Sequence, residues 1–146
     1  MRTRTILASL AVFFAGVALC FAGDPQMGTW KLNEAKSKLS PGATKNHTVV
    51  YQAAGDSVKV IVDGVEKDGK AAHNEWTGKF DGKDYPVTGD PTSDSRAYKK
   101  VDDHTLAMTI KKGGKVTVTG SIVVAADGKS RKVTTSVMGT AVYDKQ

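Results

Sequence analysis

Cysteine is almost absent from this chain of 146 residues, because the single one, Cys20, lies in an apolar N-terminal stretch. Residues 23–146 therefore offer no disulfide bond and no thiol nucleophile. Very small secreted domains usually need disulfide bonds for stability, whereas a domain of more than about 100 residues can fold on a hydrophobic core alone. The scarcity of cysteine thus excludes a disulfide scaffold and a cysteine-dependent enzyme.

Arginine is also scarce behind the N-terminal stretch. The formal net charge of the chain is +6, but Arg2 and Arg4 belong to that first segment, and residues 23–146 contain only Arg96 and Arg131. The remaining positive charge comes from lysines scattered among aspartates. Surfaces that bind nucleic acids usually carry a basic stripe with arginines and stacking aromatic residues. The sequence therefore predicts no nucleic-acid partner.

The first 22 residues have the pattern of an export signal. Arg2 and Arg4 give a positive start, an apolar run follows, and Cys20-Phe21-Ala22 offers small residues for a signal peptidase. The apolar run is slightly shorter than the about 20 residues that a membrane-spanning helix needs. We therefore predict a signal peptide over residues 1–22, no membrane span, and export to the periplasm or the medium.

Two alternatives to simple export remain open. Cys20 is the residue that a lipoprotein signal would modify, although Leu19 is larger than the residue which that processing site prefers. Retention of the apolar stretch in the membrane is the second alternative. Cleavage before Gly23 would remove the cysteine and exclude both.

Hairpin signals divide the rest of the chain. Asp-Gly and Gly-Gly pairs accept the positive φ of tight turns, and runs of β-branched and aromatic residues with period-two patterning lie between them. Gly120, inside one such run, is expected to mark a bulge or a sharp bend. The predicted strands cover residues 28–33, 48–53, 57–62, 73–80, 95–101, 105–111, 115–125, 131–138 and 140–143.

Only residues 33–39 have a helical pattern, with Asn33 as a cap, Glu34 near the start and Pro41-Gly42 as a stop. So many strands with so little helix predict an all-β domain over residues 23–146. An antiparallel meander protects its edges best by closing. We therefore predict a single antiparallel up-and-down β-barrel of about 8–10 strands, with a short helical turn after the first strand. An open two-sheet sandwich is the alternative.

A Gly-x-Trp motif on the first predicted strand carries a family resemblance. Gly28-Thr29-Trp30 precedes the helical turn and the meander of hairpins. Residues 81–89 and 111–115 are two further segments that carry the resemblance. On these residues the chain resembles small secreted bacterial proteins of the lipocalin-like, calycin type. The resemblance implies a barrel floor closed by Trp30, with Arg131 from a late strand over the ring. The chain departs from full lipocalins in being shorter and in lacking a disulfide and a long helix after the barrel.

The residues that usually carry chemistry are dispersed. His47, His73 and His104 lie on different predicted strands or turns, and His73 and Glu75 share a strand face without a third metal ligand. No nucleophile-elbow or Ser-Lys pattern is present, and the glycine loops do not open a helix as phosphate-binding loops do. We predict no catalytic or metal-ligating residue and no cofactor. The alternative is an enzyme site at the barrel mouth that uses His73, Glu75 or Tyr98.

The interior of the predicted barrel is the candidate site. A barrel of roughly eight strands is either filled by side chains or leaves room for one small ligand. With the resemblance, the sequence favours an exported protein that binds a small, largely apolar ligand without catalysis. The residues predicted to contact the ligand are Tyr51, Val60, Trp76, Tyr98, Met108 and Val118. The alternative is a structural or interaction protein of the cell envelope with a filled core. The oligomeric state is left open.

Overall fold

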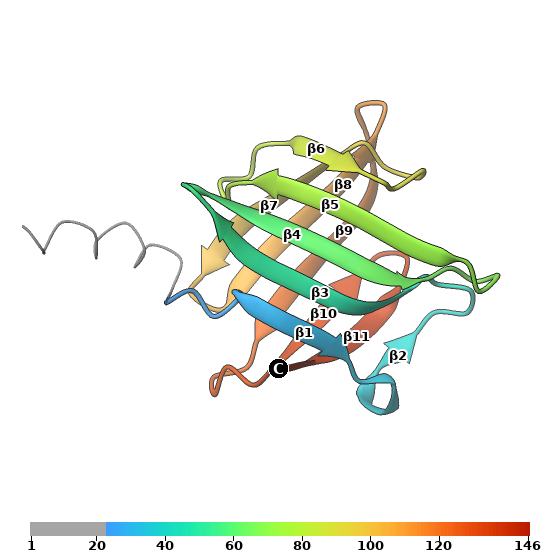
Figure 1. Cartoon of the computed structure of the whole chain (residues 1–146), viewed down its shortest axis with the longest axis horizontal. Coiled ribbons are helices and arrows are strands. Elements are labelled where there is room, and N and C mark those ends of the chain that lie inside the picture. The colour runs from blue at the N-terminus through green and yellow to red at the C-terminus, as the bar shows by residue number, and fades with distance from the viewer. Residues whose placement is uncertain (1–22) are drawn as a thin grey trace, which may run out of the picture.

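Eleven strands and one short 3-10 helix, η1 (Glu34–Lys36), make up the regular structure of residues 23–146, the part that this computed structural model describes (Figure 1). The signal-peptide prediction, including Cys20, lies outside the described residues. The strands are β1 (Gly28–Leu32), β2 (Lys38–Leu39), β3 (Lys45–Ala54), β4 (Ser57–Val65), β5 (Ala71–Gly78), β6 (Tyr85–Thr88), β7 (Ser95–Asp102), β8 (Thr105–Lys112), β9 (Lys115–Val124), β10 (Ser130–Thr135) and β11 (Gly139–Lys145).

The sheet closes on itself. From β3 to β11 each strand pairs antiparallel with its neighbour in sequence, and β1 pairs with both β3 and β11. Trp30 lies at this closure, opposite Val49 on one side and Lys145 on the other. Strand β2 stands outside the barrel and pairs only with the start of β11. The predicted up-and-down barrel is confirmed, with ten strands, and the open sandwich is excluded.

One barrel strand was absent from the sequence prediction. Strand β6 is only four residues long and contains Pro86, which has no N–H to give to a ladder. Two residue pairs hold it on each side: Glu75 and Trp76 of β5, and Ser95 and Arg96 of β7. So short a strand is defined by its neighbours rather than by its own sequence.

The predicted helix over residues 33–39 is wrong in its second half. Asn33 does cap the turn, since its side-chain Oδ1 accepts a hydrogen bond from the Lys36 backbone N–H at 3.2 Å. Only η1 is helical, however, and Ser37 is already extended. Residues Lys38–Leu39 form β2 because they pair with Thr140 and Gly139. A contact distant in sequence thus overrides the local helical preference.

Two further expectations need correction near the end of the chain. The strand expected at 131–138 ends at Thr135, and residues 136–138 form the turn into β11. The bulge expected at Gly120 lies instead at Thr117, where the β8–β9 register shifts, while Gly120 itself pairs regularly with Met108. Gly120 is needed for space, because a Cβ there would lie 2.5 Å from the Thr134 carbonyl oxygen.

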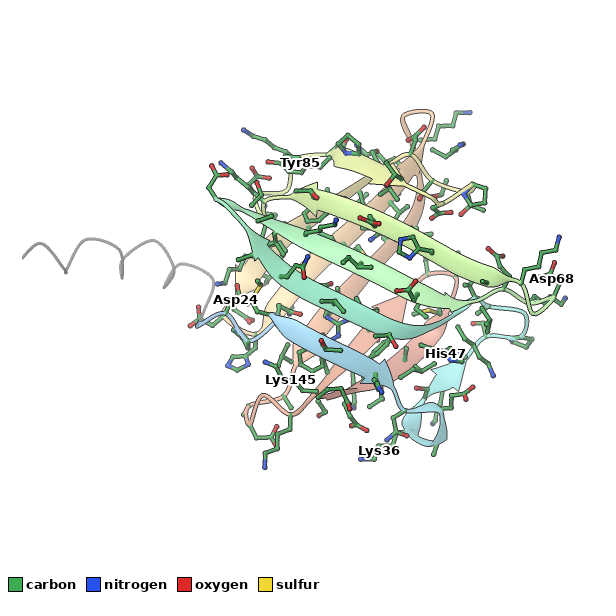
Figure 2. The ribbon with its side chains drawn as sticks, viewed as in Figure 1. Asp24, Lys36, His47, Asp68, Tyr85 and Lys145 are labelled. Atoms are coloured by element: carbon green, nitrogen blue, oxygen red, sulfur yellow. The ribbon has the colours of Figure 1, made fainter. Side chains whose placement is uncertain are left out.

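Inward-facing side chains from the barrel strands form the core. Figure 2 labels Asp24 and Asp68 at opposite ends of the barrel. At the Asp24 end, Trp30 is fully buried and its indole N–H donates to the Gln26 carbonyl at 2.9 Å. The other large, nearly fully buried side chains of the core are Trp76, Tyr143, Leu106, Val58 and Val60.

Candidate functional site

A cavity of about 400 Å³ lies inside the barrel. Its lining includes the exposed residues Pro41, Gly42 and Val137, which form a rim between the β2–β3 connection and the β10–β11 turn. Gly42 lies beside Lys67, so this rim is at the same end as Asp68 in Figure 2. The volume falls within the range of small-molecule sites in proteins. The barrel is thus hollow toward one end and closed by the Trp30 region at the other.

Apolar side chains from five strands form one part of the cavity wall. β-Strand alternation turns every second residue inward, so each strand contributes one or two of them. They are Val49 of β3, Val62 of β4, Met108 and Ile110 of β8, Val118 and Ile122 of β9, and Val133 of β10. In the described part of the chain, the lining contains no Asp, Glu, His, Lys or Ser. The titratable side chains of the described lining are those of three tyrosines and two arginines.

The structure brings together four of the six residues predicted to contact a ligand. Tyr51, Tyr98, Met108 and Val118 line the cavity. The other two, Val60 and Trp76, are buried in the core and are not part of the lining. Trp76 packs edge-on against Tyr98 with ring centroids 4.7 Å apart, and Val60 lies opposite it on β4.

The arginine expected over Trp30 is present. The Arg131 Cζ atom lies 4.8 Å from the centroid of the Trp30 ring system, 4.8 Å from that of Tyr51 and 5.1 Å from that of Tyr143. Arg131 comes from β10, a late strand, and only 2% of it is exposed. Cation–π contacts of this kind stabilise a desolvated guanidinium by up to about 2 kcal/mol each. The three rings hold the arginine at the inner end of the cavity.

A second buried arginine was missed as a site residue from the sequence. Arg96 of β7 is 5% exposed and lines the same cavity. Its Nη1 donates to the Tyr98 hydroxyl at 3.2 Å, and its Nη2 donates to Asn74 Oδ1 at 3.0 Å. The sequence could have predicted this position, because Arg96 and Tyr98 are two residues apart on one predicted strand and therefore share a face. Charged residues are expected outside, and Arg96 was therefore counted only as surface charge.

Neither arginine has a carboxylate partner. Among residues 23–146, no ion pair involves Arg96 or Arg131, and Arg96 Nε and Arg131 Nε and Nη1 are buried without a hydrogen-bond acceptor. Asp90 influences Arg96 from outside ion-pair distance. Burial raises the pKa of Asp90, but hydrogen bonds from Ser93 and Thr92 and the charge of Arg96 outweigh it and lower that pKa overall.

The phenol groups of Tyr51 and Tyr143 are neutral at physiological pH. Burial raises the pKa of Tyr143 to about 12, although the charge of Arg131 opposes the shift. Burial and the neighbouring Tyr98 raise the pKa of Tyr51 far above its usual range. The Tyr51 and Tyr143 hydroxyls are therefore hydrogen-bonding groups and not counter-ions, and no carboxylate of residues 23–146 lines the cavity beside the two guanidinium groups.

His73 and its two carboxylate neighbours, Asp63 and Glu75, lie away from the cavity. On the exposed face of β4 and β5, His73 Nδ1 is 2.5 Å from Asp63 Oδ1 and His73 Nε2 is 2.9 Å from Glu75 Oε2. Hydrogen bonds to these two carboxylates raise the pKa of His73 and favour imidazolium, whereas a metal needs the neutral ring. Among residues 23–146, no group of three or more His, Cys, Asp or Glu side chains is arranged so that it could hold a metal ion. Tyr98 is inside the barrel, so His73, Glu75 and Tyr98 do not form one site.

No protein-family model, curated protein or solved structure matches this chain. Within the 23–146 region, no helix is long and apolar enough to cross a membrane. The closed ten-stranded barrel is compatible with a calycin-like fold. The features of the molecule that bear on its function are thus the geometry and the chemistry of the cavity.

Proposed function

We propose that the protein binds a small, largely apolar molecule in the barrel cavity and performs no chemistry on it. The observation that carries this proposal is a cavity of about 400 Å³ with an apolar wall, open at one end of the barrel. Each square ångström of buried apolar surface contributes about 25 cal/mol, less the costs of association and ordering. The absence of Asp, Glu, His, Lys, Ser and Cys from the described lining supports binding over catalysis.

The cavity also favours binding over the alternative of an interaction protein with a filled interior. A filled barrel packs its inward side chains against one another at the density of an organic crystal. Here Met108, Ile110 and Val118 face space that a ligand can occupy. A mutation that fills this space distinguishes the two proposals, because ligand binding needs the space and a structural or interaction role does not.

Substitution of Met108 by tryptophan is expected to weaken ligand binding at least tenfold, because the indole ring is larger than the methionine side chain and occupies space that the ligand needs. Isothermal titration calorimetry with dodecan-1-ol, a retinoid-like alcohol and an aromatic dye gives the affinities, and thermal unfolding gives the stability. Val123→Trp is the matched control: it adds a tryptophan on the neighbouring strand β9, where Val123 is 43% exposed. This control is expected to leave affinity unchanged. Failure of every apolar probe to saturate the protein at micromolar concentration would contradict the proposal.

We further propose that the chain acts outside the cytoplasm after removal of residues 1–22. The support is the signal-peptide pattern of the sequence alone. The intact mass of the protein recovered from an exported fraction is expected to correspond to a chain that begins at Gly23. A diacylated Cys20 terminus would instead establish a lipoprotein.

A further inference from the structure

The cavity holds two positive charges and no negative one. Arg96 and Arg131 are 5% and 2% exposed, and no Asp or Glu from residues 23–146 lines the space between the strands. Burying a charge without a partner is costly, and buried charges in proteins are normally paired. The raised pKa values of Tyr51 and Tyr143 exclude their phenolates as the missing partner. Two guanidinium groups therefore lie at the cavity with no carboxylate in its described lining, and Asp90 acts on Arg96 only from outside ion-pair distance.

The hydrogen-bonding groups of the two arginines are also incompletely used. Arg131 Nε and Nη1 are buried without a hydrogen-bond acceptor. The aromatic rings around it stabilise its charge, but they do not replace oxygen acceptors for its N–H groups. Arg96 uses two nitrogens, on Tyr98 and Asn74, and leaves Nε without a partner.

Two tyrosines connect the arginines within the cavity. Arg131 Cζ is 4.8 Å from the Tyr51 ring centroid, and the Tyr51 and Tyr98 rings are 6.2 Å apart. Arg96 Cζ is 6.0 Å from the Tyr98 ring centroid. All four side chains line the same cavity, and the two tyrosine rings lie between the two arginines.

We infer that the ligand of this cavity is an acid: a small amphiphile whose carboxylate is held by the guanidinium groups of Arg131 and Arg96, beside the Tyr51 and Tyr98 hydroxyls. The inference rests on the proposed binding function and names its ligand class. A carboxylate matches the planar donor arrangement of arginine and supplies the missing negative charge. Its apolar tail lies along the Met108 and valine side chains, toward the rim.

A pair of ligands that differ only in the head group tests the inference on the unmodified protein. At neutral pH, dodecanoate is expected to bind at least tenfold more tightly than dodecan-1-ol in calorimetric titrations, a difference of about 1.4 kcal/mol. Equal affinities would overturn the acid assignment while leaving the proposed function in place. Absence of binding by both ligands, and by the other apolar probes, would overturn the proposed function as well.

Two matched variants test the arginine assignment. Arg96→Met removes a cavity charge from β7, and Lys99→Met removes a charge from an exposed position of the same strand. Arg96→Met is expected to weaken dodecanoate binding at least tenfold and to weaken dodecan-1-ol binding by a smaller factor, so that the preference for the acid falls. Lys99→Met is expected to change neither. An acid preference that persists in full in a folded Arg96→Met variant, as judged by circular dichroism, would overturn the role of this arginine.

Discussion

Replacement of Trp30 by alanine is expected to lower the free energy of unfolding by about 3–5 kcal/mol, as for other buried aromatic residues. The ring is fully buried where β1 closes the barrel against β3 and β11. Its removal leaves a cavity at the closed end and takes away one of the three rings around Arg131. A domain of this kind has about 5–15 kcal/mol of stability in total, so the loss is a large fraction of it.

Denaturant unfolding, followed by the fluorescence of the remaining Trp76, measures this loss. Trp30→Phe is the control, because it keeps an aromatic ring and removes the indole N–H that donates to the Gln26 carbonyl. The control is expected to lose less stability than the alanine variant, since most of the buried apolar surface remains. An unfolding midpoint of Trp30→Ala within error of the unmodified protein would show that the ring does not hold the closed end together.

The barrel could be predicted because its strands follow local rules. Val58, Val60 and Val62 occupy every second position of β4, and all three face the interior of the structure. Asp-Gly and Gly-Gly pairs mark four of the nine connections between barrel strands, where the glycine has the positive φ that suits a turn. Closure could be argued from the cost of free strand edges, and β1 indeed pairs with β11.

The elements that were missed depend on partners far away in the sequence. Strand β2 exists because Lys38 and Leu39 meet Thr140 and Gly139, and β6 because β5 and β7 lie on both sides of it. Gly120 is required by the carbonyl oxygen of Thr134, which no local pattern reveals. Local propensity has no information about such contacts.

Strand alternation predicted which side chains point inward but not which of them line a cavity. Val60 and Met108 both lie on inward faces, yet Val60 is covered by other side chains and Met108 borders empty space. The difference depends on the sizes of side chains across the barrel. Arg96 was missed for another reason: hydropathy places arginine outside, and the unpaired charge is visible only when the cavity is known.

Trp76 was predicted to contact the ligand but packs in the core, so its variants test which of the two roles it has. Its ring packs edge-on against Tyr85 at 5.7 Å and Tyr98 at 4.7 Å, and its indole N–H donates to the Arg96 carbonyl at 2.8 Å. Trp76→Ala is therefore expected to cost about 3–5 kcal/mol of stability. It is also expected to weaken acid binding, because Tyr98 and Arg96 lose the side chain that positions them.

Trp76→Phe distinguishes that indirect effect from direct contact with a ligand. It keeps a ring in the core and loses the hydrogen bond to Arg96, so the expected loss of stability is about 1–2 kcal/mol. Affinities for dodecanoate and dodecan-1-ol are expected to stay within about twofold, because Trp76 does not line the cavity. Denaturant unfolding, followed by Trp30 fluorescence, and calorimetry measure the two quantities. A Trp76→Phe variant with unchanged stability and an affinity loss as large as that of Met108→Trp would instead make Trp76 a ligand contact, as the sequence alone predicts.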